Sequence, residues 1–169
     1  DLEILVAFNR AIARESEGLE LDEPTVRAGL LATLRDPGRG RYLVARDADG
    51  TPVGQLMITT EWSDWRNAWF WWIQSVYVRP DARGRGVYRR LHREVERRAR
   101  ARGDVCGLRL YVAHENIRAQ AVYAAMGMAP GVYRMYEAAW RVASPGGVPD
   151  SGDQGPSGGG SRRSTNADG

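Results

Sequence analysis

The stretch from Val76 to Tyr88 contains the residues whose types and spacing point most directly to chemistry. It reads as a β-strand, then a loop with Gly84 and Gly86, then a helix that begins near Gly86. Unpaired backbone N–H groups at a helix start and the helix dipole both favour a negatively charged ligand. Arginines at or near the loop can add charge-assisted hydrogen bonds to phosphate: Arg79, Arg83, Arg85 and Arg89. We therefore predict that this loop holds the diphosphate of a cofactor.

Few other side chains have the type and spacing of a nucleophile or a metal ligand. The two histidines, His92 and His114, lack metal-ligand spacing to Cys, Asp or Glu residues, so we predict no metal site. We expect His92, on a basic helix, to lie at the surface. The single cysteine, Cys106, cannot form an intramolecular disulfide, which fits a reducing cytoplasm. We expect it to be a buried structural residue rather than a nucleophile.

Length and composition predict one folded domain followed by a disordered tail. A chain of 169 residues can bury a single core of ordinary size. No run is apolar and long enough to cross a bilayer, so we expect no membrane partner. From Ser144 onward the chain is rich in Gly, Ser, Pro, Asp and Arg and cannot bury surface. We predict a domain over residues 1–141 and a disordered Gly/Ser-rich tail over residues 142–169.

The basic residues, all of them arginine, are concentrated between Arg83 and Arg102, where only Glu94 and Glu96 oppose them. A helix of this kind can contact nucleic acid. The alternative is a solvated helix face opposite the buried stripe, and we favour it over nucleic-acid binding. The absence of lysine also excludes a Schiff-base nucleophile and an autoacetylation target in this chain.

The elements that position the loop alternate between helical and strand patterns. Asp49-Gly50 is a strong hairpin signal between two strands, Gly18 is a plausible helix C-cap, and Asp22 with Pro24 marks a helix start. The predicted elements are helices over residues 2–16 and 23–34, strands over 41–46, 52–62 and 68–78, a helix from 86 through 99, a strand over 108–112, a helix over 116–126 and a strand over 132–140. This order predicts an α+β fold, with a mixed, mostly antiparallel central sheet and helices on both faces.

Two motifs resemble the GCN5-related N-acetyltransferase (GNAT) superfamily over roughly residues 1–140. Arg83-Gly84-Arg85-Gly86-Val87 fits the family's Gln/Arg-x-x-Gly-x-Gly/Ala loop, except that Tyr88 stands where the family usually has a small residue. The stretch Asn116–Met128 is similar to the family's Asn-x-x-Ala-x-x-x-Tyr-x-x-x-Gly-Met/Phe helix. The resemblance implies a GNAT fold. Because the chain begins at Asp1 inside a helical pattern, we expect the family's first strand to lie upstream.

The resemblance also implies acetyl-CoA as cofactor and a primary amine, on a small molecule or a peptide, as acceptor. The strand from Val76 to Val78 would pair with the pantetheine arm, beside a bulge and a splay from the next strand. The N–H of Val76 would polarise the thioester carbonyl, and Tyr123 would act as acid toward the leaving thiolate. The implied cofactor-contacting residues are Val76, Tyr77, Val78, Arg83, Gly84, Arg85, Gly86, Val87, Tyr88, Asn116, Ala119 and Tyr123.

The resemblance assigns neither the general base nor the acceptor site. Trp72 occupies the strand position where many relatives carry a Glu, so the base cannot be transferred. Glu61 is our first candidate base, Glu17 the next and Asp64 the third, and a water chain is equally open. Exposed aromatic residues beside carboxylates can bind a cationic amine. The predicted acceptor pocket comprises Glu17, Glu61, Trp62, Asp64 and Trp65.

Two other functions stay open at this point. A CoA-binding sensor without turnover is favoured by Trp72 and Tyr88 and opposed by Tyr123. A nucleic-acid-binding module would use the basic helix, and its affinity would fall steeply with salt. A homodimer through the tryptophan-rich strand or the last strand is compatible with the sequence, and nothing in the sequence requires it.

Overall fold

The computed structural model describes residues 1–138 and 140. The chain divides into two units, Asp1–Ala129 and Pro130–Gly169, and the helices and strands described here belong to the first. The tail predicted over 142–169 lies outside the described residues. In the part that is described, no helix combines the length and the apolar character needed to span a membrane. Nor do the described residues include a cluster of three or more His, Cys, Asp or Glu side chains placed to hold a metal ion.

A four-stranded sheet in the order β1-β2-β3-β4 forms the centre of the first unit. Neighbouring strands are antiparallel except for β3 and β4, which are parallel. The strands are β1 (Arg41–Arg46), β2 (Pro52–Ser63), β3 (Ala68–Val78) and β4 (Val105–Leu110). This arrangement confirms the predicted mixed, mostly antiparallel sheet.

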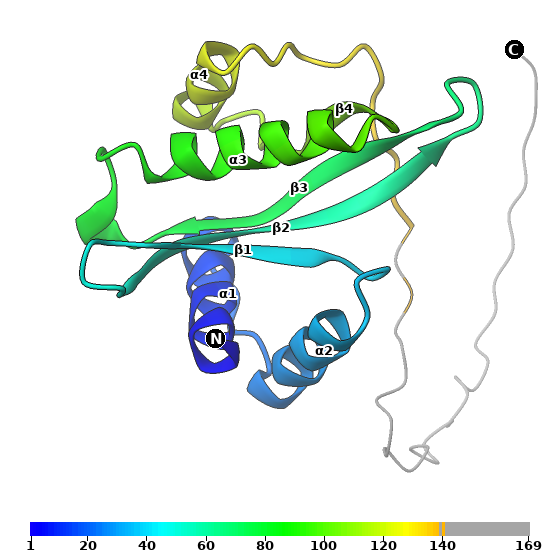
Figure 1. Cartoon of the computed structure of the whole chain (residues 1–169). Coiled ribbons are helices and arrows are strands. Elements are labelled where there is room, and N and C mark those ends of the chain that lie inside the picture. The colour runs from blue at the N-terminus through cyan, green and yellow to red at the C-terminus, as the bar shows by residue number, and fades with distance from the viewer. Residues whose placement is uncertain (139, 141–169) are drawn as a thin grey trace, which may run out of the picture. The chain divides into compact units, whose positions relative to one another are not determined.

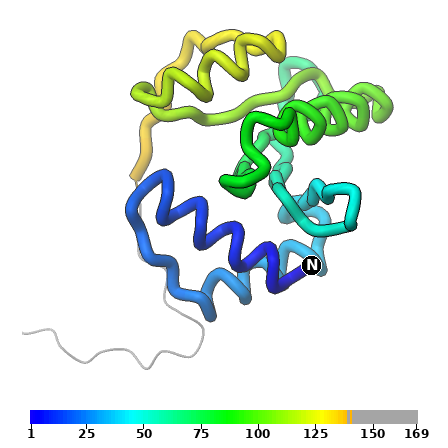
Figure 2. The backbone as a smooth tube through the Cα atoms, turned by 90° about the vertical axis from the view of Figure 1, so that its left-hand side faces the viewer, coloured from blue at the N-terminus to red at the C-terminus, as the bar shows by residue number. Residues whose placement is uncertain are grey.

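Helices cover both faces of this sheet, as predicted (Figure 1). Figure 2 shows α1 and α2 together on one side and α3 and α4 on the other. The helices are α1 (Leu2–Glu17), α2 (Glu23–Arg35), α3 (Val87–Arg102) and α4 (Ile117–Ala125), with a 3-10 turn at Pro80–Ala82.

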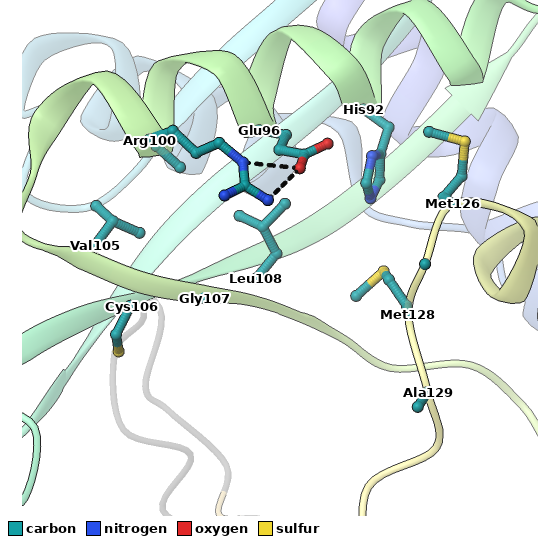
Figure 3. A pocket seen from close by; sticks show the side chains of 12 residues that line it. His92, Glu96, Arg100, Val105, Cys106, Gly107, Leu108, Met126, Met128 and Ala129 are labelled. Atoms are coloured by element: carbon teal, nitrogen blue, oxygen red, sulfur yellow. Dashed lines mark hydrogen bonds and ion pairs between the residues drawn. The ribbon is translucent and has the colours of Figure 1, made fainter.

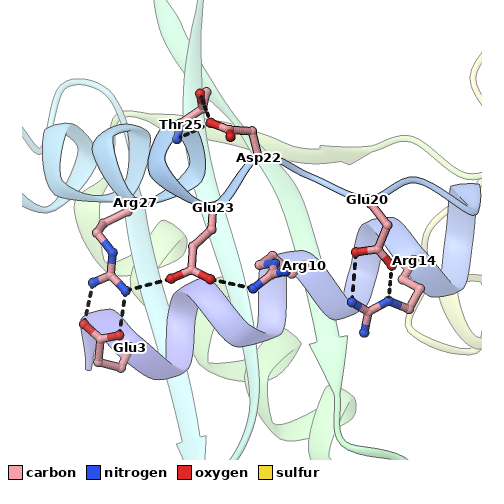
Figure 4. Close-up of polar contacts among 8 residues, drawn as sticks. All are labelled: Glu3, Arg10, Arg14, Glu20, Asp22, Glu23, Thr25 and Arg27. Atoms are coloured by element: carbon pink, nitrogen blue, oxygen red, sulfur yellow. Dashed lines mark hydrogen bonds and ion pairs between the residues drawn. The ribbon is translucent and has the colours of Figure 1, made fainter.

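The turn between α1 and α2 forms as the sequence predicts. Gly18 ends α1 with φ 65°, a left-handed conformation that favours glycine. The side chain of Asp22 caps α2 by accepting from the Thr25 N–H. Ion pairs then join the two helices (Figure 4): Arg27 with Glu3, Arg10 with Glu23, and Arg14 with Glu20 across the turn.

The main core lies between the sheet and α3. The helix contributes an apolar stripe with positions three or four apart, and β1, β2 and β3 contribute the opposing side chains. The most deeply buried members are Leu56, Ile58, Trp71, Ile73, Val87, Leu91, Val95 and Ala99. The lack of a side chain at Gly54 of β2 lets the end of β3 and the start of α3 lie close to β2. A Cβ on Gly54 would lie 2.9 Å from the Tyr77 carbonyl oxygen and 3.1 Å from a Val87 methyl.

A β-bulge interrupts β3 just before Val76. Gln55 pairs with Tyr77 and Met57 pairs with Gln74, so Leu56 faces two residues of β3 rather than one. Ser75 adopts φ 48° within the bulge. The extra residue shifts the alternation of side chains, so that Ile73 before the bulge and Val76 after it both pack toward the α3 core. The implied bulge is therefore present, and the pairing of β3 with β4 ends before it, at Ile73 and Leu110.

Two strand predictions were wrong. β4 runs from Val105 to Leu110 rather than over 108–112, because its pairing starts where Trp69 meets Val105 and where the Trp69 N–H donates to the Asp104 carbonyl. The strand predicted over 132–140 does not form in its described residues, 132–138 and 140, which contain no regular element. Alternating apolar residues form a strand only where a neighbouring strand pairs with them.

Candidate functional site

The loop between β3 and α3 leaves a row of backbone N–H groups free. Gly84 and Gly86 both adopt φ 75°, and no side chain of the described residues caps the start of α3. The first bond of the helix runs from the Arg90 N–H to the Gly86 carbonyl at 3.1 Å. The N–H groups of Val87, Tyr88 and Arg89 therefore have no acceptor within the helix. Successive outward N–H groups at a glycine turn and a helix start form an anion-binding concavity.

Two of the four predicted phosphate arginines are already engaged within the protein. Arg79 pairs with Asp81. The Nε of Arg83 donates to the Val78 carbonyl at 2.9 Å, and its Nη2 pairs with Glu15 at 2.5 Å. The ion pairs of the described residues include neither Arg85 nor Arg89. These two side chains are therefore available to an anion, whereas Arg79 and Arg83 stabilise the loop itself.

Glu15 is a site residue that the sequence analysis missed. It lies in the last turn of α1, where its carboxylate pairs with Arg83 and accepts a hydrogen bond from the Tyr77 hydroxyl at 3.3 Å. It thus ties α1 to both the end of β3 and the loop. No local pattern links it to residues more than 60 positions away. The predicted carboxylate, Glu17, lies two residues further on, in an exposed position.

Tyr123 faces α3 from α4. Its ring lies 5.7 Å from the ring of Tyr88, centroid to centroid, at an interplanar angle of 68°. Burial raises the pKa of the Tyr123 hydroxyl above its ordinary value, so the phenol keeps its proton at neutral pH. Asn116 has a structural role here, because its Oδ1 accepts from the Ala119 N–H at 3.0 Å and caps α4.

Tyr88 and His92 occupy the inner face of α3, one turn apart. The prediction of a surface position for His92 was wrong: its side chain is only 2% exposed. Its place one residue after Leu91 puts it beside the apolar stripe, on the side that faces α4. Burial lowers its pKa, so the ring is neutral at pH 7.

A cavity of about 360 Å³ lies between α3, β4 and residues 126–129 (Figure 3). His92 points into it from α3, with Met126 and Met128 on one side and the Glu96–Arg100 ion pair further along the helix. Cys106 also lines the cavity but is exposed, so the expected burial of this residue was wrong. It lies on β4, whose second edge has no partner strand among the described residues.

Glu61 is held firmly by two donors. One carboxylate oxygen accepts from Arg109 at 2.7 Å and the other from the Trp72 indole. Burial acts to raise the pKa of Glu61, but the hydrogen bonds from Trp72 and Arg109 outweigh it and lower the pKa below the ordinary value. The Trp72 ring in turn stacks on Tyr111, with centroids 4.4 Å apart. A carboxylate with a lowered pKa is a weak base.

The structure separates the predicted acceptor residues into two groups. Glu61 pairs with Phe70, six positions before Val76 on β3, which corresponds to about 20 Å along a strand. Trp62, Asp64 and Trp65 lie at or beyond this end, and Trp65 is 88% exposed. Glu17 follows Glu15, at the opposite end of β3 beside Tyr77. Glu17 therefore does not share a pocket with the other four residues.

Comparisons with known proteins agree with this geometry. The sequence model of the Acetyltransferase (GNAT) family matches residues 6–128. Among solved structures, a "possible acetyltransferase" from Clostridium difficile 630 is 39% identical with a TM-score of 0.78, covering 84% of this chain and 93% of that chain. A comparison with the curated proteins finds no match.

Two more distant structures share the fold. A GCN5-related N-acetyltransferase from Ralstonia eutropha JMP134 is 24% identical with a TM-score of 0.63, covering 82% of this chain and 92% of that chain. A ribosomal-protein-alanine N-acetyltransferase from Brucella melitensis biovar Abortus 2308 is 19% identical with a TM-score of 0.63, covering 82% of this chain and 95% of that chain.

Proposed function

The chain belongs to the acetyltransferase (GNAT) family, and from this membership we propose that it moves an acetyl group from acetyl-CoA to a primary amine of a small molecule or peptide. The amine attacks directly, in a ternary complex. The observation that carries the proposal is the start of α3, where free backbone N–H groups follow two glycines with positive φ. This arrangement fits a diphosphate.

The residues present fit acetyl-CoA. The N–H groups of Gly84 to Tyr88 would hold the diphosphate, and the guanidinium groups of Arg85 and Arg89 would add charge-assisted bonds. No heavy atom lies within 4 Å of the place where a Cβ on Gly84 would be, so a ligand can approach the backbone closely there. Beyond Ile73, β3 has no pairing with β4, which leaves that edge of the strand for the pantetheine arm.

The chain's own groups supply the remaining chemistry. When bound, acetyl-CoA supplies a thioester carbon that an amine can attack. The N–H of Val76, just after the bulge, donates a hydrogen bond to the carbonyl oxygen, where negative charge develops. The Tyr123 hydroxyl, kept protonated by burial, gives its proton to the leaving sulfur.

Glu61 fits the role of an anionic anchor better than that of a base. Its lowered pKa keeps it charged above acidic pH, while Trp62, the next residue of β2, presents its ring on the opposite face of the sheet. The amine then loses its proton through water rather than directly to Glu61, which the fold keeps about 20 Å along the strand from Val76.

The test is a thermal shift with acetyl-CoA, followed by thiol release on a panel of spermidine, a dipeptide with a free N-terminus and an aminoglycoside. We expect acetyl-CoA to raise the Tm and at least one amine to release free CoA. Because Cys106 is a free, exposed cysteine and an exposed thiol would add to the thiol signal, the assay uses Cys106→Ser. A Tm shift without thiol release would indicate a CoA-binding sensor, and no shift would contradict both.

A further inference from the structure

Tyr88 carries a buried hydroxyl that makes no hydrogen bond to the described residues. The residue is the second of α3 and stands where the resembled loop usually has a small residue. A buried hydroxyl without a partner is unfavourable. Its presence is explained if the hydroxyl gains a partner in a state of the protein other than the resting one.

The ring of Tyr88 contacts two other rings. It makes an edge-to-face contact with Tyr123 and another with His92, the latter at 5.8 Å and 61°. Such pairs have a preferred geometry and limit ring rotation. His92 is itself buried one turn further along α3. The contact between Tyr88 and Tyr123 connects the start of α3, which follows the cofactor loop, to α4.

We propose, resting on the proposed function, that Tyr88 is a positioning residue for Tyr123. Its ring fixes the orientation of the Tyr123 ring, and its hydroxyl donates a hydrogen bond to the Tyr123 oxygen once that oxygen has lost its proton. In that step the O–H bond of Tyr123 breaks and an S–H bond forms on the leaving thiolate. The negative charge passes from sulfur to the Tyr123 oxygen, which later regains a proton from water.

Burial and charge at Tyr88 and Tyr123 determine which of the two phenols ionises first, and they favour Tyr123. Burial strongly raises the pKa of Tyr88, and negative charge on Tyr123 raises it further. The pKa of Tyr123 is also raised by burial, but the shift is larger for Tyr88. His92, the other titratable ring against Tyr88, is neutral because burial lowers its pKa. Tyr88 therefore remains a donor while Tyr123 carries the charge.

The kinetic test is a double-mutant cycle. We expect Tyr88→Phe, which keeps the ring and removes the hydroxyl, to lower kcat about tenfold while the KM for acetyl-CoA changes less than about twofold. In the Tyr123→Phe background the same substitution should leave kcat unchanged, because the charged partner is gone. Tyr133→Phe removes a hydroxyl from a tyrosine that is 86% exposed and lies outside the first unit; it is the control and should not change kcat.

A second readout needs neither cofactor nor turnover. In protein labelled with fluorotyrosine, the fluorine signal that disappears in Tyr123→Phe reports the ionisation of Tyr123. A donated hydrogen bond favours the charged form, so Tyr88→Phe should raise the midpoint of this titration by about one pH unit. The Tm of Tyr88→Phe should not fall, because the removed hydroxyl has no partner among the described residues.

The outcomes separate this inference from the proposed function. An unchanged kcat in Tyr88→Phe, an equal loss in both backgrounds, or an unshifted Tyr123 titration would overturn the role of Tyr88 alone. If the wild-type protein shows no Tm shift with acetyl-CoA and no thiol release, the proposed function fails and the inference fails with it. If Tyr123→Phe leaves kcat unchanged while wild type is active, Tyr123 is not the acid, and the proposed role of Tyr88 in positioning it fails as well.

Discussion

Tyr123 offers a phenol whose burial keeps it protonated at neutral pH, next to the helix that begins at the cofactor loop. We expect Tyr123→Phe to lower kcat by roughly ten- to a thousandfold, because one general acid contributes about 10²–10⁴ in rate. The KM for acetyl-CoA should hardly change, since no backbone contact of the loop is lost. Steady-state kinetics of thiol release measure both parameters. An unchanged kcat would remove the acid role from Tyr123.

Glu61 makes a pH-dependent contribution to stability. Its pKa in the folded protein is lowered from the ordinary 4.5, so its stabilising effect is fully present above pH 4.5 and is lost as the pH falls through the folded value. We expect Glu61→Gln to lower the Tm at pH 7 by a few degrees at most, as the pair with Arg109 is partly exposed. The difference between the two proteins should shrink as the pH falls below 4.5 and disappear once Glu61 is protonated in the folded protein. A difference that persists after this protonation would mean that Glu61 acts by packing rather than by charge.

Individual side chains were the least predictable part of the site. The anion-binding turn at Gly84 and Gly86 was predictable from the spacing of these glycines before a helix, because few other kinds of turn require two glycines at this place. The contact of Glu15 with Arg83 depends on how α1 crosses the sheet, which no local pattern encodes. The burial of His92 was missed because its position lies at the edge of the apolar stripe, where Tyr88 and the segment over residues 126–128 lie beside it.

At the scale of elements, Gly54 lets β2, the end of β3 and the start of α3 approach one another. We expect Gly54→Ala to destabilise the protein by about 1–3 kcal/mol, since its Cβ would lie 2.9 Å from backbone. It should also weaken acetyl-CoA binding, because the crowded atoms belong to the residues that frame the loop. Denaturant unfolding and acetyl-CoA titration measure the two effects.

Gly29→Ala is the matched control in the middle of α2. No atom lies within 4 Å of its added Cβ, so we expect a gain of ~0.5–1 kcal/mol from reduced backbone entropy of the unfolded chain. Its acetyl-CoA affinity should equal that of wild type. Equal destabilisation by both substitutions would mean that the close approach at Gly54 does not matter.

The prediction of the elements was most accurate where local signals were strong. Asp22, Gly18 and Asp49-Gly50 place three boundaries correctly because each satisfies a specific backbone requirement. The bulge at Ser75 came from the family resemblance, since its register depends on how Leu56 meets two residues of the neighbouring strand. β4 begins three residues earlier than predicted because Gly107, a weak strand former, fits against the Phe70 ring.

At the scale of the whole molecule, ion pairs engage four of the seven arginines on α3. Glu94 pairs with Arg97 and Arg98, Glu96 pairs with Arg100, and Asp104 pairs with Arg102. We therefore expect no binding to a labelled DNA duplex at physiological salt, measured by fluorescence anisotropy. Binding at low salt alone would reflect the net charge of +3. Tight binding at physiological salt with a steep salt dependence would support the nucleic-acid alternative.

The fold as a whole was predictable because element order and the two motifs constrain it jointly. The mixed sheet follows from a hairpin that leads into strands joined by helices. The acceptor pocket was not predictable, because Glu17 and Trp65 lie near each other only in an assumed topology. The register of β2 against β3 instead places the turn around Trp65 at the end of the sheet remote from Tyr77.

Transfer of an isotope-labelled acetyl group from acetyl-CoA to an amine, followed by mass spectrometry, tests the central claim most directly. We expect a labelled N-acetyl product with at least one amine of the panel, formed in proportion to the protein added. We also expect loss of this product in Gly86→Val, because a side chain at φ 75° strains the loop that holds the diphosphate. No labelled product from any amine, or equal product from folded Gly86→Val, would contradict the account.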